Sequence, residues 1–215
     1  KTTSAVNLTA ALGALGKKIL LVDIDPQGNT TSGYGISRKN LSATSYELLI
    51  GACTASEAVI KTKFAGVDII PSNINLAGAE LELAIMEKRE ALLKNALATI
   101  QENYDYIFFD CPPSLGLITL NALTASDSFI VPIQCEYYAL EGLSQLLITI
   151  KRINKLYNPK VGVCGILITM YNKRLLLSAQ VISELEKHYG QLLFKNTEIS
   201  LRCFSSEIIE LSAEE

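Results

Sequence analysis

The segment Lys18–Asn29, KILLVDIDPQGN, decides the fold of this chain. It begins as a short, continuously apolar strand from Ile19 to Val22, which is typical of a parallel sheet covered on both faces. The strand then delivers two carboxylates, Asp23 and Asp25, into a Pro-Gln-Gly turn. Ligands of open parallel sheets bind beyond the carboxyl ends of the strands, so this segment indicates a nucleotide phosphate site.

Helical and extended patterns alternate along the rest of the chain, as they do in parallel β-α units. Before the first strand, the spacing predicts a helix that ends at Gly16, with one apolar face made of Ala5, Leu8, Leu12 and Leu15. Further apolar strands are predicted at residues 67–70, 106–109, 128–133 and 163–169. Further helices are predicted at residues 80–100 and 178–188, and around an apolar face made of Leu140, Leu143, Leu147 and Ile150. We therefore expect an α/β fold with a mostly parallel twisted sheet flanked by helices on both faces.

The composition excludes several classes of protein. The chain has 215 residues, of which 49% are hydrophobic, and no linker interrupts it, so we expect a single domain over residues 1–215. Its five cysteines are widely spaced and contain no C-x-x-C pair, which argues against a disulfide framework or a zinc site and fits a reducing cytoplasm. No apolar run reaches the roughly 18 residues that span a bilayer. A formal net charge of -3 argues against a globally basic nucleic-acid binder.

Three groups converge on the predicted carboxyl edge of the sheet. Asp25 follows one strand, Asp110 follows another, and Lys1 with Thr2 and Thr3 begins the first helix. A lysine and hydroxyls at a helix N-terminus suit a nucleotide phosphate and its magnesium ion. Taken alone, the Lys-Thr-Thr run fits an ordinary helix start, and Asp110 with the Cys-Pro-Pro that follows it fits a chain reversal. Their convergence favours a nucleotide site.

Four segments carry a resemblance to a known family. They are KTTSAVNL (1–8), LLVDIDPQGNTTSGYG (20–35), NYDYIFFDCPPSLGLITLNALTASD (103–127) and VPIQCEYYALEGLSQLL (131–147). Together they resemble the ParA/Soj chromosome- and plasmid-partitioning ATPases, within the deviant Walker A class that includes MinD. The resemblance implies a P-loop NTPase-like fold, ATP and Mg2+ as cofactors, and an ATP-dependent homodimer. It also implies a ParB/Spo0J-type DNA-binding partner that stimulates hydrolysis.

The resemblance also implies roles for particular residues. Lys1 matches the catalytic lysine of the phosphate loop, Thr2 the magnesium-binding hydroxyl, and Thr3 a phosphate contact. Asp25 matches the aspartate that lies near the attacking water and the metal, and Asp110 the carboxylate that holds the metal through water. Asp23 is interpreted as structural. The glycine loop, the strand before it and the final helix of the family are expected to be missing from residues 1–215, and the loop's second lysine would lie before Lys1.

A basic stretch from Lys151 to Arg174 contains six basic residues and no acidic one. Such a cluster can follow DNA phosphates without reading sequence, although for Arg152 and Lys155 alone a solvated helix face is the favoured interpretation. The sequence around Arg174, TMYNKR, resembles the family segment that carries a non-specific DNA-binding arginine. Arg202 corresponds to a second such arginine. Non-specific DNA is therefore the expected partner, and a cytoplasmic, nucleoid-associated location is the expected one.

The C-terminal part departs from the family pattern. Glu198 and Ile199 stand where the family has proline and arginine, which affects the contacts to adenine and the assignment of Arg202. The acidic end, IIELSAEE, argues against a MinD-like membrane helix, which would be basic. Two functions remain open: a partitioning ATPase that resets its DNA binding by hydrolysis, and a ParA-like regulator that keeps the fold without turnover.

Overall fold

The structure, a computed structural model, describes residues 1–137 and 139–195. Contacts divide the chain into two compact units, which we call unit 1 (Lys1–Ala125) and unit 2 (from Ser126 onward). The single domain expected from the sequence stays a prediction.

Unit 1 consists of one sheet with helices on both faces. Its strands are β1 (Ile19–Asp23), β2 (Ile60–Lys61), β3 (Val67–Ile70) and β4 (Tyr106–Asp110). Its helices are α1 (Thr2–Ala14), α2 (Asn29–Gly33), α3 (Ser45–Leu49), α4 (Ala55–Ala58), α5 (Ala79–Leu83), α6 (Leu92–Leu97) and α7 (Leu117–Ala125). Two 3₁₀ helices, η1 (Ile74–Gly78) and η2 (Gln101–Asn103), complete it. The predicted strands at residues 19–22, 67–70 and 106–109 are confirmed.

The sheet of unit 1 has the strand order β2-β3-β1-β4. Strand β1 pairs in parallel with both β3 and β4, whereas the short β2 is antiparallel to β3 and was missed in the sequence. All five residues of β1 are buried, as its uninterrupted apolar pattern predicted. The strand that carries the carboxylates is therefore an internal strand of the sheet.

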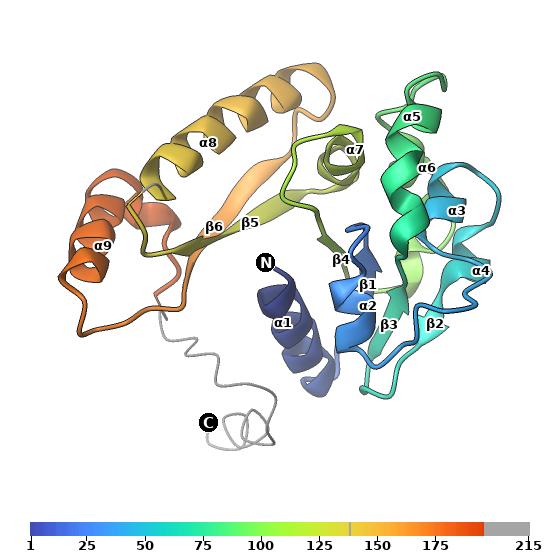
Figure 1. Cartoon of the computed structure of the whole chain (residues 1–215), viewed down its shortest axis with the longest axis horizontal. Coiled ribbons are helices and arrows are strands. Elements are labelled where there is room, and N and C mark those ends of the chain that lie inside the picture. The colour runs from blue at the N-terminus through green and yellow to red at the C-terminus, as the bar shows by residue number, and fades with distance from the viewer. Residues whose placement is uncertain (138, 196–215) are drawn as a thin grey trace. The chain divides into compact units, whose positions relative to one another are not determined.

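Alternate residues of β1 face the two helical layers. Leu20 and Val22 pack in one hydrophobic cluster with helices α3 to α7. Ile19 and Leu21 pack in a second cluster with Val6 of α1. Figure 1 shows α1 beside one face of this sheet and α5 and α6 beside the other. This arrangement gives unit 1 the expected α/β layers.

Helix α1 packs on the sheet through part of its predicted face, since Ala5 and Leu12 are partly buried there beside Val6. Val6, Thr9 and Gly13 are its buried residues, whereas Leu15 lies beyond the helix end and is 65% exposed. Thr9 is buried because its hydroxyl bonds the backbone oxygen of Ala5 at 2.6 Å and the Tyr34 hydroxyl at 2.7 Å. The apolar pattern could not reveal a buried threonine whose polar group is satisfied inside the protein.

The long helix predicted over residues 80–100 is two separate helices, α5 and α6. Lys88 between them has φ +50°, which an α-helix cannot contain. The buried side chain of Asn121 donates to the backbone oxygen of Arg89 at 2.7 Å and accepts from the backbone nitrogen of Leu93 at 3.1 Å. A distant side chain therefore satisfies the backbone at the break, which no local pattern could predict.

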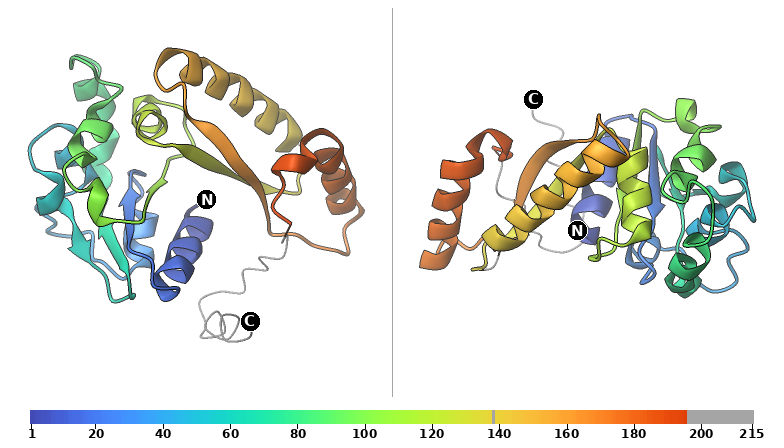
Figure 2. Two further views of the ribbon diagram at one scale, coloured as in Figure 1. Left: turned by 180° about the vertical axis from the view of Figure 1, so that it is seen from behind. Right: turned by 90° about the horizontal axis from the view of Figure 1, so that it is seen from above.

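Unit 2 contains the parallel strands β5 (Ser128–Gln134) and β6 (Gly162–Thr169). Its helices are α8 (Ala139–Leu156) and α9 (Leu176–Tyr189), followed by η3 (Gly190–Leu192). Both helices pack on the strand face that carries Val131, Ile133 and Ile166, and Figure 2 shows them beside the two strands. The predicted apolar face of the helix after β5 is confirmed. Among residues 1–137 and 139–195, no helix is both long enough and apolar enough to cross a bilayer.

Candidate functional site

The carboxylates of Asp23 and Asp110 end two neighbouring strands. Asp23 of β1 and Asp110 of β4 are register partners, and both are buried. The backbone nitrogen of Ile24 donates to the backbone oxygen of Asp110 at 3.0 Å, so the two strands remain joined just beyond this pair. The expectation that strand ends would bring the carboxylates together is correct for β1 and β4.

Asp25 lies in a tight turn between β1 and α2. Its Oδ1 accepts a hydrogen bond from the backbone nitrogen of Gln27 at 2.9 Å, and its backbone oxygen accepts one from Gly28 at 2.9 Å. Gly28 has φ +60°, and a Cβ there would come within 3.0 Å of the backbone oxygen of Ser72. Arg38 also donates to the backbone oxygen of Gln27. The turn is therefore fixed from both sides and holds the Asp25 carboxylate partly exposed.

Two adjacent threonines at the start of α2 hold the two buried carboxylates. Thr31 donates to Asp23 Oδ2 from its backbone nitrogen at 2.8 Å and from its hydroxyl at 2.7 Å. Thr30 donates from its hydroxyl to Asp110 Oδ2 at 2.5 Å. Sequence reasoning missed both threonines. They follow the DPQGN motif directly, but the strand register was needed to show which carboxylate each one meets.

The pKa of Asp23 supports a structural role for this carboxylate. Burial raises the pKa of Asp23 to about 6, although its hydrogen bonds with Thr31 oppose the shift and the charge of Asp110 adds to it. A group whose ionisation is disfavoured and whose oxygens already have partners suits a structural role, as interpreted from the sequence.

The thiol of Cys111 lies among the charges of the candidate site. Desolvation raises its pKa to about 12, the negative charges of Asp110 and Asp25 act in the same direction, and the positive charge of Lys1 opposes them. A thiol with so high a pKa is not a nucleophile at neutral pH, which agrees with the sequence interpretation.

Lys1, Thr2 and Thr3 lie at the N-terminal end of α1. Lys1 is the N-cap residue, and its backbone oxygen accepts from the backbone nitrogen of Ala5 at 2.9 Å. Lys1 and Thr3 are exposed and Thr2 is partly exposed. Since the backbone N–H groups of a first helical turn have no partner within the helix, this end of α1 suits an anion. The roles of these three residues stay predictions.

The donors available at this edge of the sheet fit a magnesium ion held together with a phosphate. Mg2+ is usually bound by one or two carboxylates, with water and substrate phosphate as its other ligands. Asp110 and Asp25 supply carboxylates, and Thr2 supplies a hydroxyl. Within the part of the chain that the structure describes, no three His, Cys, Asp or Glu side chains form a cluster that could hold a metal ion by themselves.

Comparison with known proteins agrees with this arrangement. The sequence model of the AAA domain family matches residues 1–163. The sporulation initiation inhibitor protein Soj of Bacillus subtilis is 50% identical over 195 residues, which cover 91% of this chain and 77% of that protein. The chromosome partitioning protein ParA of Caulobacter vibrioides is 44% identical over 196 residues, which cover 90% of this chain and 73% of that protein. The chain belongs to the ParA/Soj family.

A solved structure extends the comparison to three dimensions. The cobyrinic acid a,c-diamide synthase of Mycobacterium smegmatis, with a bound ATP analogue and magnesium, superposes with a TM-score of 0.83 at 40% identity. The match covers 87% of this chain and 77% of that one. The P-loop NTPase-like α/β class expected from the ParA/Soj resemblance is thereby confirmed.

Of the two arginines expected to bind DNA, the structure describes Arg174. Arg174 is exposed in the turn between β6 and α9, and its backbone nitrogen donates to Asn172 Oδ1 at 3.0 Å. Arg202, the altered Glu198–Cys203 segment and the acidic C-terminal end lie outside the described residues.

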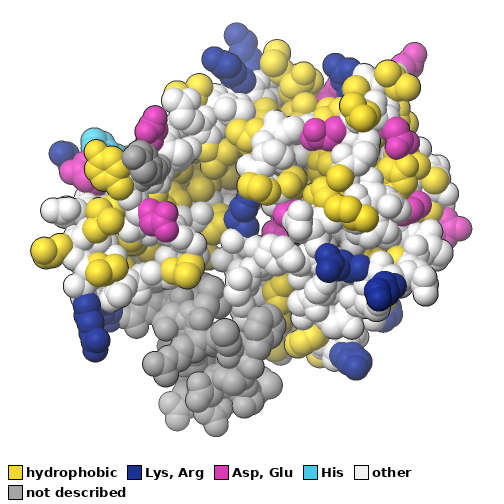
Figure 3. Space-filling view, viewed as in Figure 1, with side chains coloured by type: hydrophobic (Ala, Val, Ile, Leu, Met, Phe, Trp, Pro, Cys, Tyr) yellow, Lys and Arg dark blue, Asp and Glu magenta, His cyan; other side chains and the backbone are white. Residues whose placement is uncertain are grey.

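The basic stretch from Lys151 to Arg174 does not form one patch. Strand β6, of eight residues, separates Lys160 at its start from Arg174 beyond its end, which amounts to about 26 Å at 3.3 Å per residue. On the face drawn in Figure 3, basic side chains occur in small separate groups with acidic ones between them. Sequence proximity across a strand does not give spatial proximity, so the stretch is spread along β6, and its role in following DNA phosphates stays a prediction.

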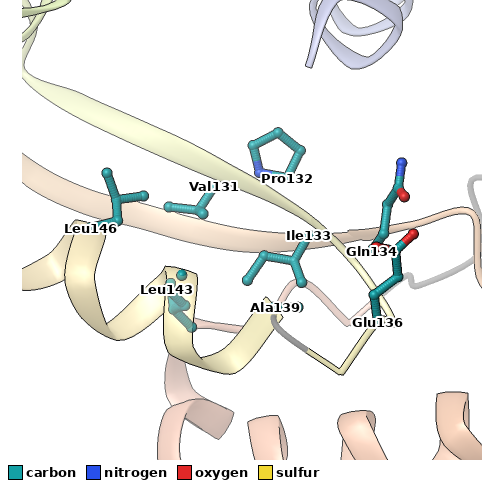
Figure 4. Close-up of a pocket in the computed structure, with 9 residues that line it drawn as sticks. Val131, Pro132, Ile133, Gln134, Glu136, Ala139, Leu143 and Leu146 are labelled. Atoms are coloured by element: carbon teal, nitrogen blue, oxygen red, sulfur yellow. The ribbon is translucent and has the colours of Figure 1, made fainter. Parts of the chain in front are cut away.

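A groove in unit 2, with a volume of about 370 Å³, lies between β5 and α8 (Figure 4). Aliphatic side chains, among them Val131, Leu143 and Leu146, form most of its wall, and Gln134 and Glu136 provide polar groups. None of the predicted ATP or magnesium residues lines it. The groove is therefore separate from the candidate nucleotide site.

Proposed function

We propose that this member of the ParA/Soj family is a DNA-partitioning ATPase that binds ATP with Mg2+. The observation that carries the proposal is the carboxyl edge of the unit 1 sheet, where the charges of Lys1, Asp25 and Asp110 all act on the thiol of Cys111. A cation and two carboxylates in one place suit a nucleotide phosphate with its metal. The ATP analogue and magnesium in the similar synthase structure support the same cofactors.

Each residue has a separate task in this proposal. Lys1 neutralises the outer phosphates, and the hydroxyls of Thr2 and Thr3 meet the metal and a phosphate at the N-terminus of α1. Asp110 holds the metal through water. Asp25 orients the attacking water, since the described residues place no hydrogen bond on its Oδ2. When bound, Mg2+ supplies charge neutralisation on the phosphate oxygens.

ATP binding is proposed to join two copies of the chain into a homodimer. Large apolar side chains at the carboxyl ends of β5 and β6 support a contact surface there, since Tyr137 is 75% exposed and Met170 is 67% exposed. The dimer would bind DNA without sequence preference through Arg174 and, at the second family position, Arg202. A ParB-type partner would stimulate hydrolysis and release the DNA, and this cycle implies a cytoplasmic, nucleoid-associated protein.

Magnesium-dependent ATP hydrolysis, measured on the full-length protein with DNA present, tests the enzymatic part of the proposal. The parent should release phosphate slowly, and Asp25→Ala should lower the rate by at least about a hundredfold, as expected for loss of a water-positioning group. Asp127→Ala is the control, because Asp127 is an exposed aspartate of unit 2 whose backbone oxygen, and not its carboxylate, accepts a hydrogen bond from Gly162. A parent without magnesium-dependent turnover would instead favour the non-hydrolysing regulator.

A further inference from the structure

Within residues 1–137 and 139–195, the hydroxyl of Thr30 has one hydrogen-bond partner, and that partner is Asp110. Thr30 is completely buried and Asp110 is 3% exposed, and the 2.5 Å between Thr30 Oγ and Asp110 Oδ2 is typical of a hydroxyl donating to a carboxylate. Its neighbour Thr31 differs, since it bonds Asp23 twice and also accepts from the backbone nitrogen of Ser72 at 2.9 Å. Thr31 thus joins three parts of the fold, whereas the Thr30 hydroxyl serves Asp110 alone.

This bond fixes the orientation of the Asp110 carboxylate. A carboxyl group at the end of a strand can otherwise rotate about its terminal torsion, for which the preference is broad. Thr30 is β-branched and helical, so its own side chain has few rotamers, and burial restricts it further. With Oδ2 held by the Thr30 hydroxyl, Oδ1 is the oxygen left to face the nucleotide site.

The same bond couples Asp110 to the turn that carries Asp25. Helix α2 begins directly after Gly28, whose backbone nitrogen bonds the backbone oxygen of Asp25 at 2.9 Å. Thr30 is the second residue of this helix, so a displacement of the turn is transmitted to Asp110 through one short segment. The backbone bond from Ile24 joins the main chain of Asp110 to the segment before Asp25, and the Thr30 bond links the Asp110 carboxylate itself to the segment after Asp25.

We propose that Thr30 is a positioning residue, whose hydroxyl orients Asp110 toward the magnesium ion and keeps it in register with the Asp25 turn. The proposal rests on the metal-binding part of the proposed function. Thr30 does not itself touch the metal in this proposal. Its loss should therefore change how strongly nucleotide binding depends on magnesium, and not nucleotide binding without magnesium.

Calorimetry with a non-hydrolysable ATP analogue on the full-length protein tests this proposal. The ratio of the affinity in magnesium to the affinity in EDTA should fall about tenfold in Thr30→Val, the size expected for losing a hydrogen bond to a charged group. Thr30→Ser should restore the ratio, because serine keeps the hydroxyl. Thr31→Val is the matched control, since it removes an equally buried hydroxyl from the next residue and should lower thermal stability but leave the ratio unchanged.

The outcomes separate this proposal from the proposed function. Asp110→Asn should lose the magnesium dependence whether or not Thr30 matters. If Asp110→Asn loses it and Thr30→Val keeps the parent ratio, the positioning role of Thr30 is overturned and the metal site stands. If Asp110→Asn also keeps the parent ratio, Asp110 is not a metal residue and both proposals fail.

Discussion

Asp25 and Asp110 are both carboxylates at strand ends, but their surroundings suit different tasks. Asp110 is buried and held by Thr30, which suits a group that must stay fixed beside a metal ion. Asp25 is partly exposed, and among the residues that the structure describes only its Oδ1 is engaged, by the backbone of its own turn. A group that orients a water molecule needs such a free oxygen.

This difference predicts that substitutions of Asp25 and Asp110 affect nucleotide affinity differently. Asp25→Ala should bind ATP with magnesium about as tightly as the parent, because it removes a group that acts on water and not on phosphate. Asp110→Ala should bind about tenfold more weakly in magnesium and equally in EDTA, the scale of one charge-assisted contact. Equal losses in the two variants, measured by calorimetry, would show that the roles are assigned wrongly.

Gly28 is required by the backbone of the turn. Its φ of +60° is costly for any residue with a side chain, and a Cβ would also meet Arg38 and the backbone oxygen of Ser72. Gly35 has φ +74° but open space around it, so it is a matched control. Both alanine variants should lose about 1–2 kcal/mol in chemical denaturation from the backbone alone, and Gly28→Ala should lose more. Equal losses would mean that the close approach to Ser72 is harmless.

The raised pKa of Cys111 predicts low reactivity. At pH 8 almost none of this thiol is ionised, and the thiolate fraction grows only as the pH approaches about 12. Iodoacetamide should therefore label Cys111 far more slowly than the exposed Cys164, as followed by mass spectrometry. Labelling of both cysteines at the same rate would contradict the environment described for Cys111.

At the scale of elements, the break between α5 and α6 depends on one buried amide. Asn121→Leu would leave the backbone oxygen of Arg89 and the backbone nitrogen of Leu93 without their partner, at a cost of about 1–3 kcal/mol. The amide of Leu93 should then exchange with solvent much faster in hydrogen exchange by NMR. Asn95→Ala, on the exposed side of α6, is the control. Unchanged protection of the Leu93 amide would show that Asn121 does not hold the break.

Runs of apolar residues in the sequence correctly predicted the main parallel strands. The runs around Ile19, Ile107 and Ile166 lie in parallel strands, of which β1 is completely buried, and continuous apolar sequence is the expected signal there. The predictions failed where a distant group decides, as at the α5–α6 break and at Thr9, whose hydroxyl is satisfied by Tyr34.

In the candidate site, too, the sequence predicted some residues and missed others. Strand ends and the resemblance to the ParA/Soj family were enough to select Asp25 and Asp110. The partners of those carboxylates could not be selected, because Thr30 and Thr31 are told apart only by the register of β1 with β4.

For the molecule as a whole, we expect a single copy of the chain to bind DNA weakly. The formal net charge is -3, and β6 separates Lys160, which precedes it, from Arg174, which follows it. Two copies joined by ATP would present two Arg174 turns, and linked sites gain strongly in avidity. Binding should therefore require ATP, ignore sequence and weaken steeply as salt rises.

The most direct test of this account is a mobility-shift titration of random-sequence duplex with the full-length protein at low salt. With ATP and magnesium the parent should shift the duplex, and without ATP it should not. Arg174→Glu should abolish the shift while an ATP-dependent dimer remains visible by size-exclusion chromatography, and Arg202→Glu should behave alike. A parent that never shifts the duplex, or an Arg174→Glu variant that binds as well as the parent, would contradict the proposed DNA-partitioning function.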